Sequence, residues 1–219
     1  LVLDDITIQN CYSYGLGLHT TSTQLGVSLG KQNQQKSTQV WDLNRKLSSH
    51  LHKILQEFIQ PQRWENINLA AVAKGPGSFT GIRIGITAAR TIAQQLEIPL
   101  FSISTLAGFA WFHKDNKLFK ELIPVQMEAS RGQVYGAVYQ KKSKGNGLIA
   151  VVNDTVMELD KWEKVLKDLN LFHEPLIVTS EIGATVCSIL ELAEFEWEQG
   201  KRPHFSESMP FYGHLNVPR

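Results

Sequence analysis

The sequence has few cysteines, little net charge and no basic tail. Its two cysteines, Cys11 and Cys187, lie far apart and form no Cys-x-x-Cys pair, so we predict neither a disulfide framework nor a structural zinc site. The formal net charge is +1, and only Lys141, Lys142 and Lys144 approach a basic run. A protein that grips a nucleic acid by itself carries a strongly basic face. We therefore interpret the three lysines as part of a solvated hairpin loop.

Long apolar runs are also missing, and none approaches the length needed to span a bilayer. The first ten residues carry Asp4 and Asp5 and lack the cationic segment of a secretory signal. Together with the cysteine pattern, these features predict a cytoplasmic protein without a membrane segment.

Motifs that carry catalysis are missing as well. The sequence contains no His-Glu-x-x-His. It also has no Gly-x-Ser-x-Gly elbow, because its match to that spacing, from Gly26 to Gly30, falls inside the predicted hairpin and not at a strand-to-helix turn. His50 and His52 are two residues apart on a predicted helix, where they cannot share a face. We interpret Asp154 and Asp160 as turn and cap residues, and His19 as a satisfied or solvated histidine rather than a base. The prediction is therefore no catalytic residue, no metal ligand and no cofactor.

The first half of the chain has the pattern of strands followed by alternating helices and strands. Alternating apolar residues predict a hairpin from Gly15 to Gly30 and a third strand at 38–41. A helical stripe follows at 45–59, then a buried strand at 69–73, a helix at 82–96 and a strand at 98–103. Ser104 or Thr105 is expected to cap a further helix, which runs through Trp111.

The second half repeats this theme. Strands are predicted at 123–127, 134–139, 148–152 and 176–178, helices at 159–169 and 182–193, and an irregular tail at 199–219. Two α/β halves, each opened by strands, predict a duplicated ribonuclease-H-like or actin-like architecture. We place the boundary between Phe112 and Glu121, which gives a first subdomain at 1–112 and a smaller second one at 113–219.

A glycine-rich segment separates the buried strand at 69–73 from the following helix. Free backbone amides at a helix start can bind phosphate, whereas the alternative is a tight turn with Ser78 or Thr80 as the cap. The segment does not match the Walker pattern, because no Gly-Lys-Ser/Thr follows. Arg83 opposes the helix dipole, so it either meets an anion or acidic partner or is simply solvated. The candidate phosphate or nucleotide loop comprises Gly75, Gly77, Ser78, Thr80 and Arg83.

The same helix carries a small residue at every fourth position: Gly81, Gly85, Ala89 and Ala93. Glycine inside a helix costs roughly 1 kcal/mol relative to alanine, so Gly85 is expected to have a packing reason. Two explanations stay open: close packing on this protein's own sheet, or an interface with a helix of another chain.

Several motifs give this chain a resemblance to one family. The run from Gly75 to Gly85, GPGSFTGIRIG, looks like the signature of the TsaB (YeaZ) family, and Ser104-Thr105-Leu106 matches a similar segment. Weaker likenesses cover the first hairpin, the segment from Glu128 to Tyr135, and Pro210-Phe211-Tyr212. The resemblance extends over 14–212, nearly the whole chain.

This resemblance implies an actin-like fold of two subdomains and a non-catalytic scaffold role. The expected partners are TsaD, which transfers threonylcarbamoyl to adenosine 37 of tRNAs that read ANN codons, and the ATPase TsaE. The chain alone is expected to form a homodimer, and tRNA is expected to be reached only through the complex.

The resemblance also implies that the interface uses the two helices at about 46–60 and 82–96, which agrees with the small-residue face. The candidate interface residues are Leu47, Leu51, Gly81, Gly85, Ala89 and Ala93. A bulky residue at Gly85 or Ala89 is predicted to break the heterodimer and to leave the fold intact.

Departures from the family pattern favour the non-catalytic role. His19 occupies the position where many members have Asp, and Leu47 occupies that of a His that is a metal ligand in TsaD. Glu128 replaces an Asp, and Ser130 replaces an Arg. An independent actin-like ATPase or kinase is the alternative, but it needs an acidic metal-holding residue, and the nearest candidates are Asp42 and Asp4. A peptidase lacks both a zinc ligand set and a nucleophile motif in this sequence.

Overall fold

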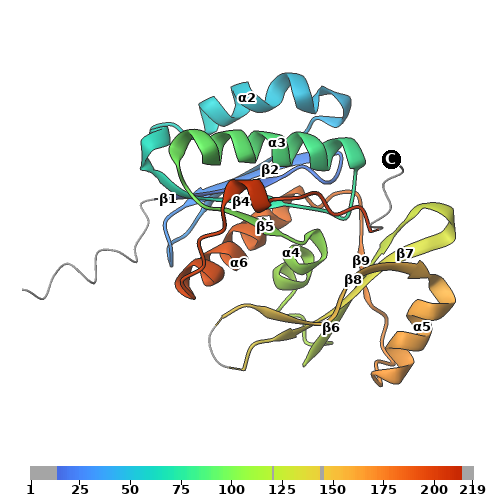
Figure 1. The fold of residues 1–219 in the computed structure, drawn as a ribbon. Coiled ribbons are helices and arrows are strands. Elements are labelled where there is room, and N and C mark those ends of the chain that lie inside the picture. The colour runs from blue at the N-terminus through green and yellow to red at the C-terminus, as the bar shows by residue number, and fades with distance from the viewer. Residues whose placement is uncertain (1–13, 120, 144–145, 214–219) are drawn as a thin grey trace, which may run out of the picture.

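The computed structural model describes residues 14–119, 121–143 and 146–213. In this part of the chain, two β-sheets lie at an angle to each other, and helices cover their faces (Figure 1). The predictions made for the first ten residues, for Cys11 and for Lys144 fall outside the described residues.

The first sheet is built from β1 (Tyr14–His19), β2 (Gln24–Gly30), β3 (Ser37–Asp42), β4 (Ile67–Ala73) and β5 (Leu100–Ile103). Its order is β3-β2-β1-β4-β5, in which β2 is antiparallel to its neighbours while β1, β4 and β5 are parallel. Side chains alternate along β4, because Ala70 and Val72 join one hydrophobic core while Leu69, Ala71 and Ala73 join another. A strand that is buried on both faces is apolar throughout, as the sequence of β4 is.

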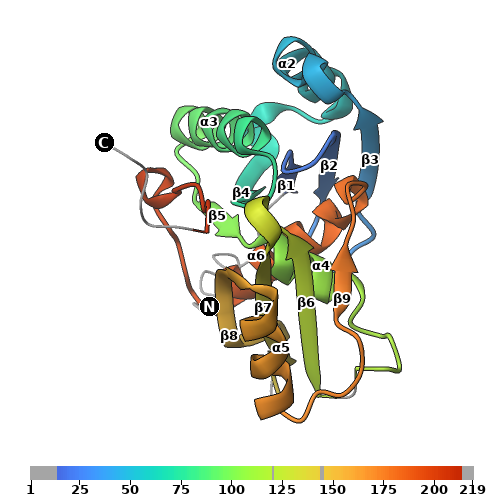
Figure 2. The same ribbon diagram turned by 90° about the vertical axis from the view of Figure 1, so that its right-hand side faces the viewer.

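Three helices cover the two faces of the first sheet. The amphipathic helices α2 (Leu47–Phe58) and α3 (Phe79–Leu96) lie side by side on one face, and α6 (Val186–Glu198) packs on the other (Figure 2). The predicted stripe of α2 is confirmed, because Leu47, Leu51, Ile54 and Leu55 are all buried.

The second sheet repeats the strand pattern of the first. It contains β6 (Leu122–Glu128), β7 (Gln133–Lys141), β8 (Leu148–Glu158) and β9 (Leu176–Val178), in the order β8-β7-β6-β9. Here β7 is antiparallel to β6 and β8, and β9 is parallel to β6. Helix α5 (Leu159–Asp168) covers one face, with Trp162 fully buried against Gly136. The predicted α/β fold of two similar halves is confirmed.

The predicted division at residues 112 and 113 separates the strands but not the helices. Helix α4 (Thr105–Phe112) follows the first sheet in sequence and packs on the second. Helix α6 follows the second sheet and packs on the first, where Ile189, Leu190 and Ala193 contact the core beneath β4 and β5. The two halves thus exchange their last helices, so the subdomains are not two contiguous segments of chain.

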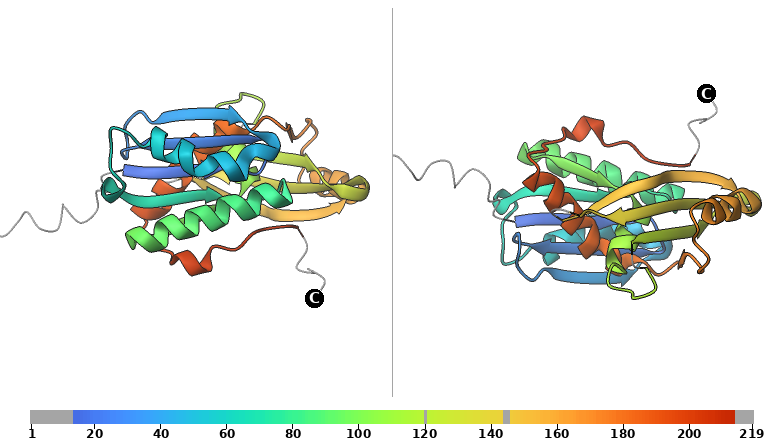
Figure 3. Two further views of the ribbon diagram at one scale, coloured as in Figure 1. Left: turned by 90° about the horizontal axis from the view of Figure 1, so that it is seen from above. Right: turned by 90° about the horizontal axis from the view of Figure 1, so that it is seen from below.

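The C-terminal tail was predicted to be irregular, and beyond α6 it contains only a short 3₁₀ turn at Phe205–Glu207. The backbone N–H of Leu100 donates to the Pro203 carbonyl at 3.2 Å, so the tail is hydrogen-bonded to β5, an edge strand of the first sheet. It then runs alongside α3 toward the second sheet (Figure 3). Near its end, the Phe211 N–H donates to the Lys74 carbonyl at 2.8 Å.

Candidate functional site

The glycine-rich turn between β4 and α3 is fixed against the turn between β1 and β2. The N–H of Ser78 donates to the Thr21 carbonyl at 2.8 Å, and a side chain at Gly77 would meet that same carbonyl at 2.3 Å. Gly77 has φ +147°, a conformation that few residues other than glycine adopt. Ser78 then caps α3, because its Oγ accepts from the Gly81 N–H at 3.3 Å. The predicted cap and tight turn are both present.

The small residues of α3 are used inside this chain. A Cβ at Gly81 would lie 2.0 Å from the Thr20 carbonyl oxygen, and one at Gly85 would lie 2.0 Å from Thr20 Oγ1. The Thr20 hydroxyl also donates to the Gly81 carbonyl at 2.8 Å. Of the two explanations left open by the sequence, close packing within the protein accounts for both glycines.

The candidate interface residues need correction for this reason. All six are buried within the chain: Leu47, Leu51, Gly81, Gly85, Ala89 and Ala93. The expectation that a bulky residue at Gly85 leaves the fold intact is wrong, because Thr20 leaves no space for it. Of the six, Leu51 alone also lines the open space between α2 and α3 on the outer side of the molecule.

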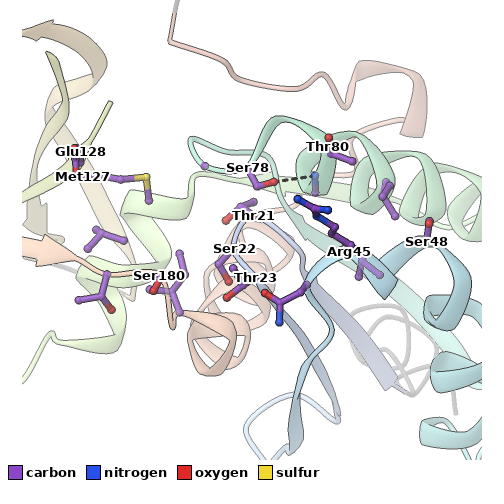
Figure 4. Close-up of a pocket in the computed structure, with 18 residues that line it drawn as sticks. Thr21, Ser22, Thr23, Arg45, Ser48, Ser78, Thr80, Met127, Glu128 and Ser180 are labelled. Carbon is purple, nitrogen blue, oxygen red and sulfur yellow. Dashed lines mark hydrogen bonds between the residues drawn. The ribbon is translucent and has the colours of Figure 1, made fainter. Parts of the chain in front are cut away.

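A cleft of about 610 Å³ opens between the two sheets (Figure 4). Its lining comes from the turn at 21–23, the starts of α2 and α3, the end of β6 and the segment after β9. Most of the polar groups are hydroxyls, among them those of Ser22, Ser78 and Thr80. Arg45 extends from the segment before α2 toward Ser78, whereas Glu128 lies across the cleft. A largely apolar cleft with several hydroxyls at its edge suits a small molecule that forms hydrogen bonds.

The cleft brings together only part of the predicted phosphate loop. Gly77, Ser78 and Thr80 line it, but Gly75 contacts the tail instead, where a Cβ would lie 2.4 Å from the Phe211 carbonyl. Arg83 is on the outer side of α3 and does not line the cleft. The arginine that does line it is Arg45, which our sequence interpretation did not select. Only its position just before a helix could have indicated it.

His19 lies at the end of β1, directly before the cleft turn, and is completely buried. Burial lowers its pKa from 6.5 to about 4, because desolvation disfavours the charged imidazolium. Its Nε2 lies 3.5 Å from Thr21 Oγ1, and its Nδ1 has no hydrogen-bond partner among the described residues. His19 is therefore a neutral interior histidine rather than a solvated one.

A second polar cluster was missed in the sequence, because Asp154 was assigned to a turn. Asp154 lies within β8, where it accepts hydrogen bonds from Ser104 and Tyr139. Burial raises the pKa of Asp154, and the buried Tyr139 beside it has a pKa well above its usual value. Because Ser104 belongs to the N-terminus of α4, this cluster joins that helix to the second sheet.

A groove of about 610 Å³ lies between α2 and α3, on the outer side of the molecule. Leu51, Ile84 and Ala88 are among its apolar lining residues, and Phe79 lines one end with 55% of its surface exposed. Arg83 and His52 are the cationic or titratable side chains of the lining. Contiguous apolar surface with exposed aromatic residues is typical of sites that bind another protein.

The described residues contain no group of three or more His, Cys, Asp or Glu side chains arranged to hold a metal ion. Among the same residues, no helix is both long and apolar enough to cross a bilayer.

Known proteins with similar sequences identify the family of this chain. Residues 42–178 match the family described as TsaD, tRNA N6-adenosine threonylcarbamoyltransferase. The protein named tRNA threonylcarbamoyladenosine biosynthesis protein TsaB from Bacillus subtilis is 35% identical over 159 residues, which is 70% of this chain and 66% of that protein. The Escherichia coli protein of the same name is 41% identical over 83 residues, 36% of this chain and 34% of its own length. Matches thus span about two thirds or less of these relatives.

Solved structures show the same fold. YeaZ from Pseudomonas aeruginosa superposes with a TM-score of 0.74 at 19% identity, and the match covers 91% of this chain and 100% of the other. A second Pseudomonas aeruginosa structure, described as similar to the peptidase YEAZ, gives a TM-score of 0.75 at 19% identity, with 92% and 100% covered. The predicted actin-like, ribonuclease-H-like fold class is confirmed. With the sequence match over more than half of its length, the chain belongs to the TsaB (YeaZ) family.

Proposed function

We propose that this chain is a non-catalytic scaffold subunit in the formation of N6-threonylcarbamoyladenosine in tRNA. A homologue of TsaD is its partner and carries out the threonylcarbamoyl transfer to adenosine 37 of tRNAs that read ANN codons. The names of the curated relatives and the match to the TsaD family support the pathway. The scaffold role within this pathway is inferred from the exposed surface between α2 and α3.

The observation that carries the scaffold role is the groove between α2 and α3. Helices α2 and α3 lie side by side, and the groove between them has a volume of about 610 Å³. Phe79, which lines this groove, is 55% exposed. Full burial of a large apolar side chain that was exposed to water is favourable by about 1.5 to 3 kcal/mol. A partner that covers Phe79 would gain part of this free energy. This groove is the face that we assign to the partner, in place of the buried small-residue face.

The chemistry of the cleft supports the absence of an enzymatic role. Arg45 and Glu128 are its charged lining residues, and Glu128 is exposed at the far side. Leu47 also lines the cleft, where the family resemblance places a metal-binding histidine in TsaD, and a leucine side chain has no ligand atom. His19 is enclosed in the interior and has no access to a substrate.

The remaining partners follow from the same proposal. TsaE, the ATPase of the system, joins the complex, and tRNA is reached through the complex rather than by this chain alone. In isolation the chain forms a homodimer through the same helical face. The protein acts in the cytoplasm, where its tRNA substrate is found.

Co-purification with the cognate TsaD, followed by size-exclusion chromatography with light scattering, tests this proposal. We expect a one-to-one complex. Replacing Thr87, an exposed residue of the groove, with Arg should weaken the complex at least tenfold, because a long charged side chain then occupies the groove. Gln95→Arg is the matched control on the exposed side of the same helix outside the groove and should bind normally. No complex, or equal loss in both variants, would overturn the assignment.

The independent ATPase remains the alternative to test. Of its two candidate acids, Asp4 lies outside the described residues, and Asp42 does not line the cleft and accepts a hydrogen bond from Gln24 at 2.9 Å. Titration of the isolated chain with Mg-ATP in a calorimeter should give no binding heat. Saturable heat, lost in an Arg45→Ala variant, would favour the ATPase over the scaffold.

A further inference from the structure

We infer that Arg83, Phe79 and Tyr212 form the anchor of the partner face, and that this anchor receives an acidic segment of a protein partner. The inference rests on the proposed function, because it names the chemistry that the partner presents to the groove. It adds the C-terminal tail to an interface otherwise made of α2 and α3.

The three side chains form one stack at the end of the groove. The Arg83 guanidinium carbon lies 5.5 Å from the centre of the Phe79 ring, and the Phe79 and Tyr212 rings are 4.7 Å apart with an angle of 34°. Arginine and tyrosine are enriched among the residues that dominate binding energy at interfaces. Cation–π contact holds the guanidinium over the ring and leaves its edge free for a carboxylate.

Tyr212 is held in place by both halves of the molecule. Its carbonyl accepts from the Tyr135 hydroxyl at 3.3 Å, and the N–H of the preceding Phe211 donates to the Lys74 carbonyl at 2.8 Å. A Cβ at the following Gly213 would lie 2.4 Å from the Tyr135 ring, so the chain passes close to the second sheet. The tail therefore fixes the tyrosine beside α3 before any partner binds, which lowers the entropy cost of forming the interface.

Positive charge is concentrated on the two helices. Together, α2 and α3 contain Lys53, Arg83 and Arg90 against Glu57 alone, a net charge of +2, whereas the whole chain has a net charge of +1. Glu57 already pairs with Lys53 at 3.8 Å. Arg83 makes no ion pair with any described residue, and it is exposed on the second turn of α3, which begins at Phe79. A carboxylate on the partner would satisfy it.

A second copy of this chain fits the anchor less well than an acidic partner. A symmetric dimer brings identical patches together, so the positively charged faces of two copies would meet each other. Nucleic acid fits less well too, because its affinity comes from several phosphate contacts, while the groove offers Arg83, His52 and an apolar floor that includes Leu51.

The test measures binding to the cognate TsaD by calorimetry at low and high salt. Arg83→Glu should weaken binding at least tenfold and Arg83→Gln severalfold, with a smaller salt dependence than the wild type. Tyr212→Ala should weaken binding about tenfold, whereas Tyr212→Phe, which keeps the ring, should bind almost normally. Lys164→Glu on α5 makes the same charge change away from the groove and serves as the control. Thermal melts establish that each variant is folded.

The outcomes separate the two proposals. If the wild type does not bind TsaD at either salt concentration, the proposed function fails. If the wild type binds and Arg83→Glu binds equally well, the acidic-segment inference alone is overturned. It is also overturned if Arg83→Glu lowers affinity for tRNA in an anisotropy assay while TsaD binding is unchanged, or if it abolishes a homodimer that forms more tightly than the heterodimer.

Discussion

The cleft and the groove have the same volume and share part of their lining, yet their chemistry differs. Each encloses about 610 Å³, and Ser48, Thr80 and Ile84 line both, so the first turns of α2 and α3 separate them. The cleft carries more hydroxyls and two opposite charges, whereas the groove has a larger apolar share of its surface and an exposed Phe79. One pair of helices therefore lines two hollows that differ in their hydroxyl content and in their charge.

The largest expected effect on stability comes from a substitution at Gly85. This residue directly follows Ile84, which lines both the cleft and the groove. In an exposed helix, glycine to alanine stabilises by roughly 1 kcal/mol. At Gly85 a leucine side chain would instead enter the space of Thr20 Oγ1, 2.0 Å from a Cβ. We expect Gly85→Leu to lower the free energy of unfolding by about 3 kcal/mol, because overpacking displaces the turn before the cleft. Chemical denaturation followed by circular dichroism measures this change.

Thr87→Leu on the same helix is the control for that experiment. Thr87 is exposed and lines the groove, so the leucine should leave stability within about 0.5 kcal/mol of the wild type. Equal stability of the two variants would show that Thr20 can move away. Packing within this chain would then not require a small residue at Gly85.

Acid should destabilise the protein because His19, buried directly before the turn that lines the cleft, resists protonation in the folded state. The folded pKa of His19 is about 4 against an ordinary value of 6.5, so the folded state resists protonation. Its contribution to stability is complete above pH 6.5 and declines as the pH falls toward 4. With about 1.4 kcal/mol per pKa unit, the loss between pH 7 and pH 4 is about 3 kcal/mol at most.

Urea denaturation across this pH range tests the role of His19. In His19→Leu the stability should fall less steeply with acid than in the wild type. His52→Leu replaces an exposed histidine of the groove and should retain the wild-type slope. If both variants keep that slope, His19 is protonated in the folded protein at its ordinary pKa.

A smaller effect is expected from the cap of α3, which belongs to the cleft. Ser78→Ala removes the hydroxyl that accepts from the Gly81 N–H at 3.3 Å and should cost about 1 kcal/mol. The thermal midpoint should fall accordingly, while Ser48→Ala, an exposed serine on α2 without a capping role, should not change it. Equal midpoints would mean that solvent replaces the cap.

Local patterns in the sequence predicted most of the fold. Period-two alternation located the first hairpin, and the apolar stripe located α2, because each pattern reports burial of one face. The pattern for β8 was predicted only to residue 152, since polar Asn153 and Asp154 interrupt it, although the strand continues to Glu158. A buried aspartate that is satisfied by Ser104 and Tyr139 depends on tertiary contacts that no local pattern contains.

The candidate site was less predictable for a related reason. Spacing indicated correctly that Gly85 needs a close neighbour, but it could not distinguish Thr20 of the same chain from a helix of another chain. The exchange of α4 and α6 between the sheets and the position of Tyr212 beside Phe79 join residues that are far apart in sequence. Such contacts follow from topology, which a single sequence specifies only weakly.

The smallest expected effect distinguishes the two surfaces most directly. Arg45 and Arg83 are both exposed arginines near the start of a helix, but Arg45 lines the cleft and Arg83 lines the groove. Arg45→Gln should change stability by no more than about 0.5 kcal/mol, since the side chain makes no ion pair with a described residue. It should also leave affinity for TsaD within about twofold of the wild type by calorimetry, in contrast to Arg83→Gln, because rim charges away from a contact contribute little to affinity. If both substitutions weaken the complex equally, the partner must cover the first turns of α2 and α3 from both sides, and the cleft and the groove would then be one binding surface.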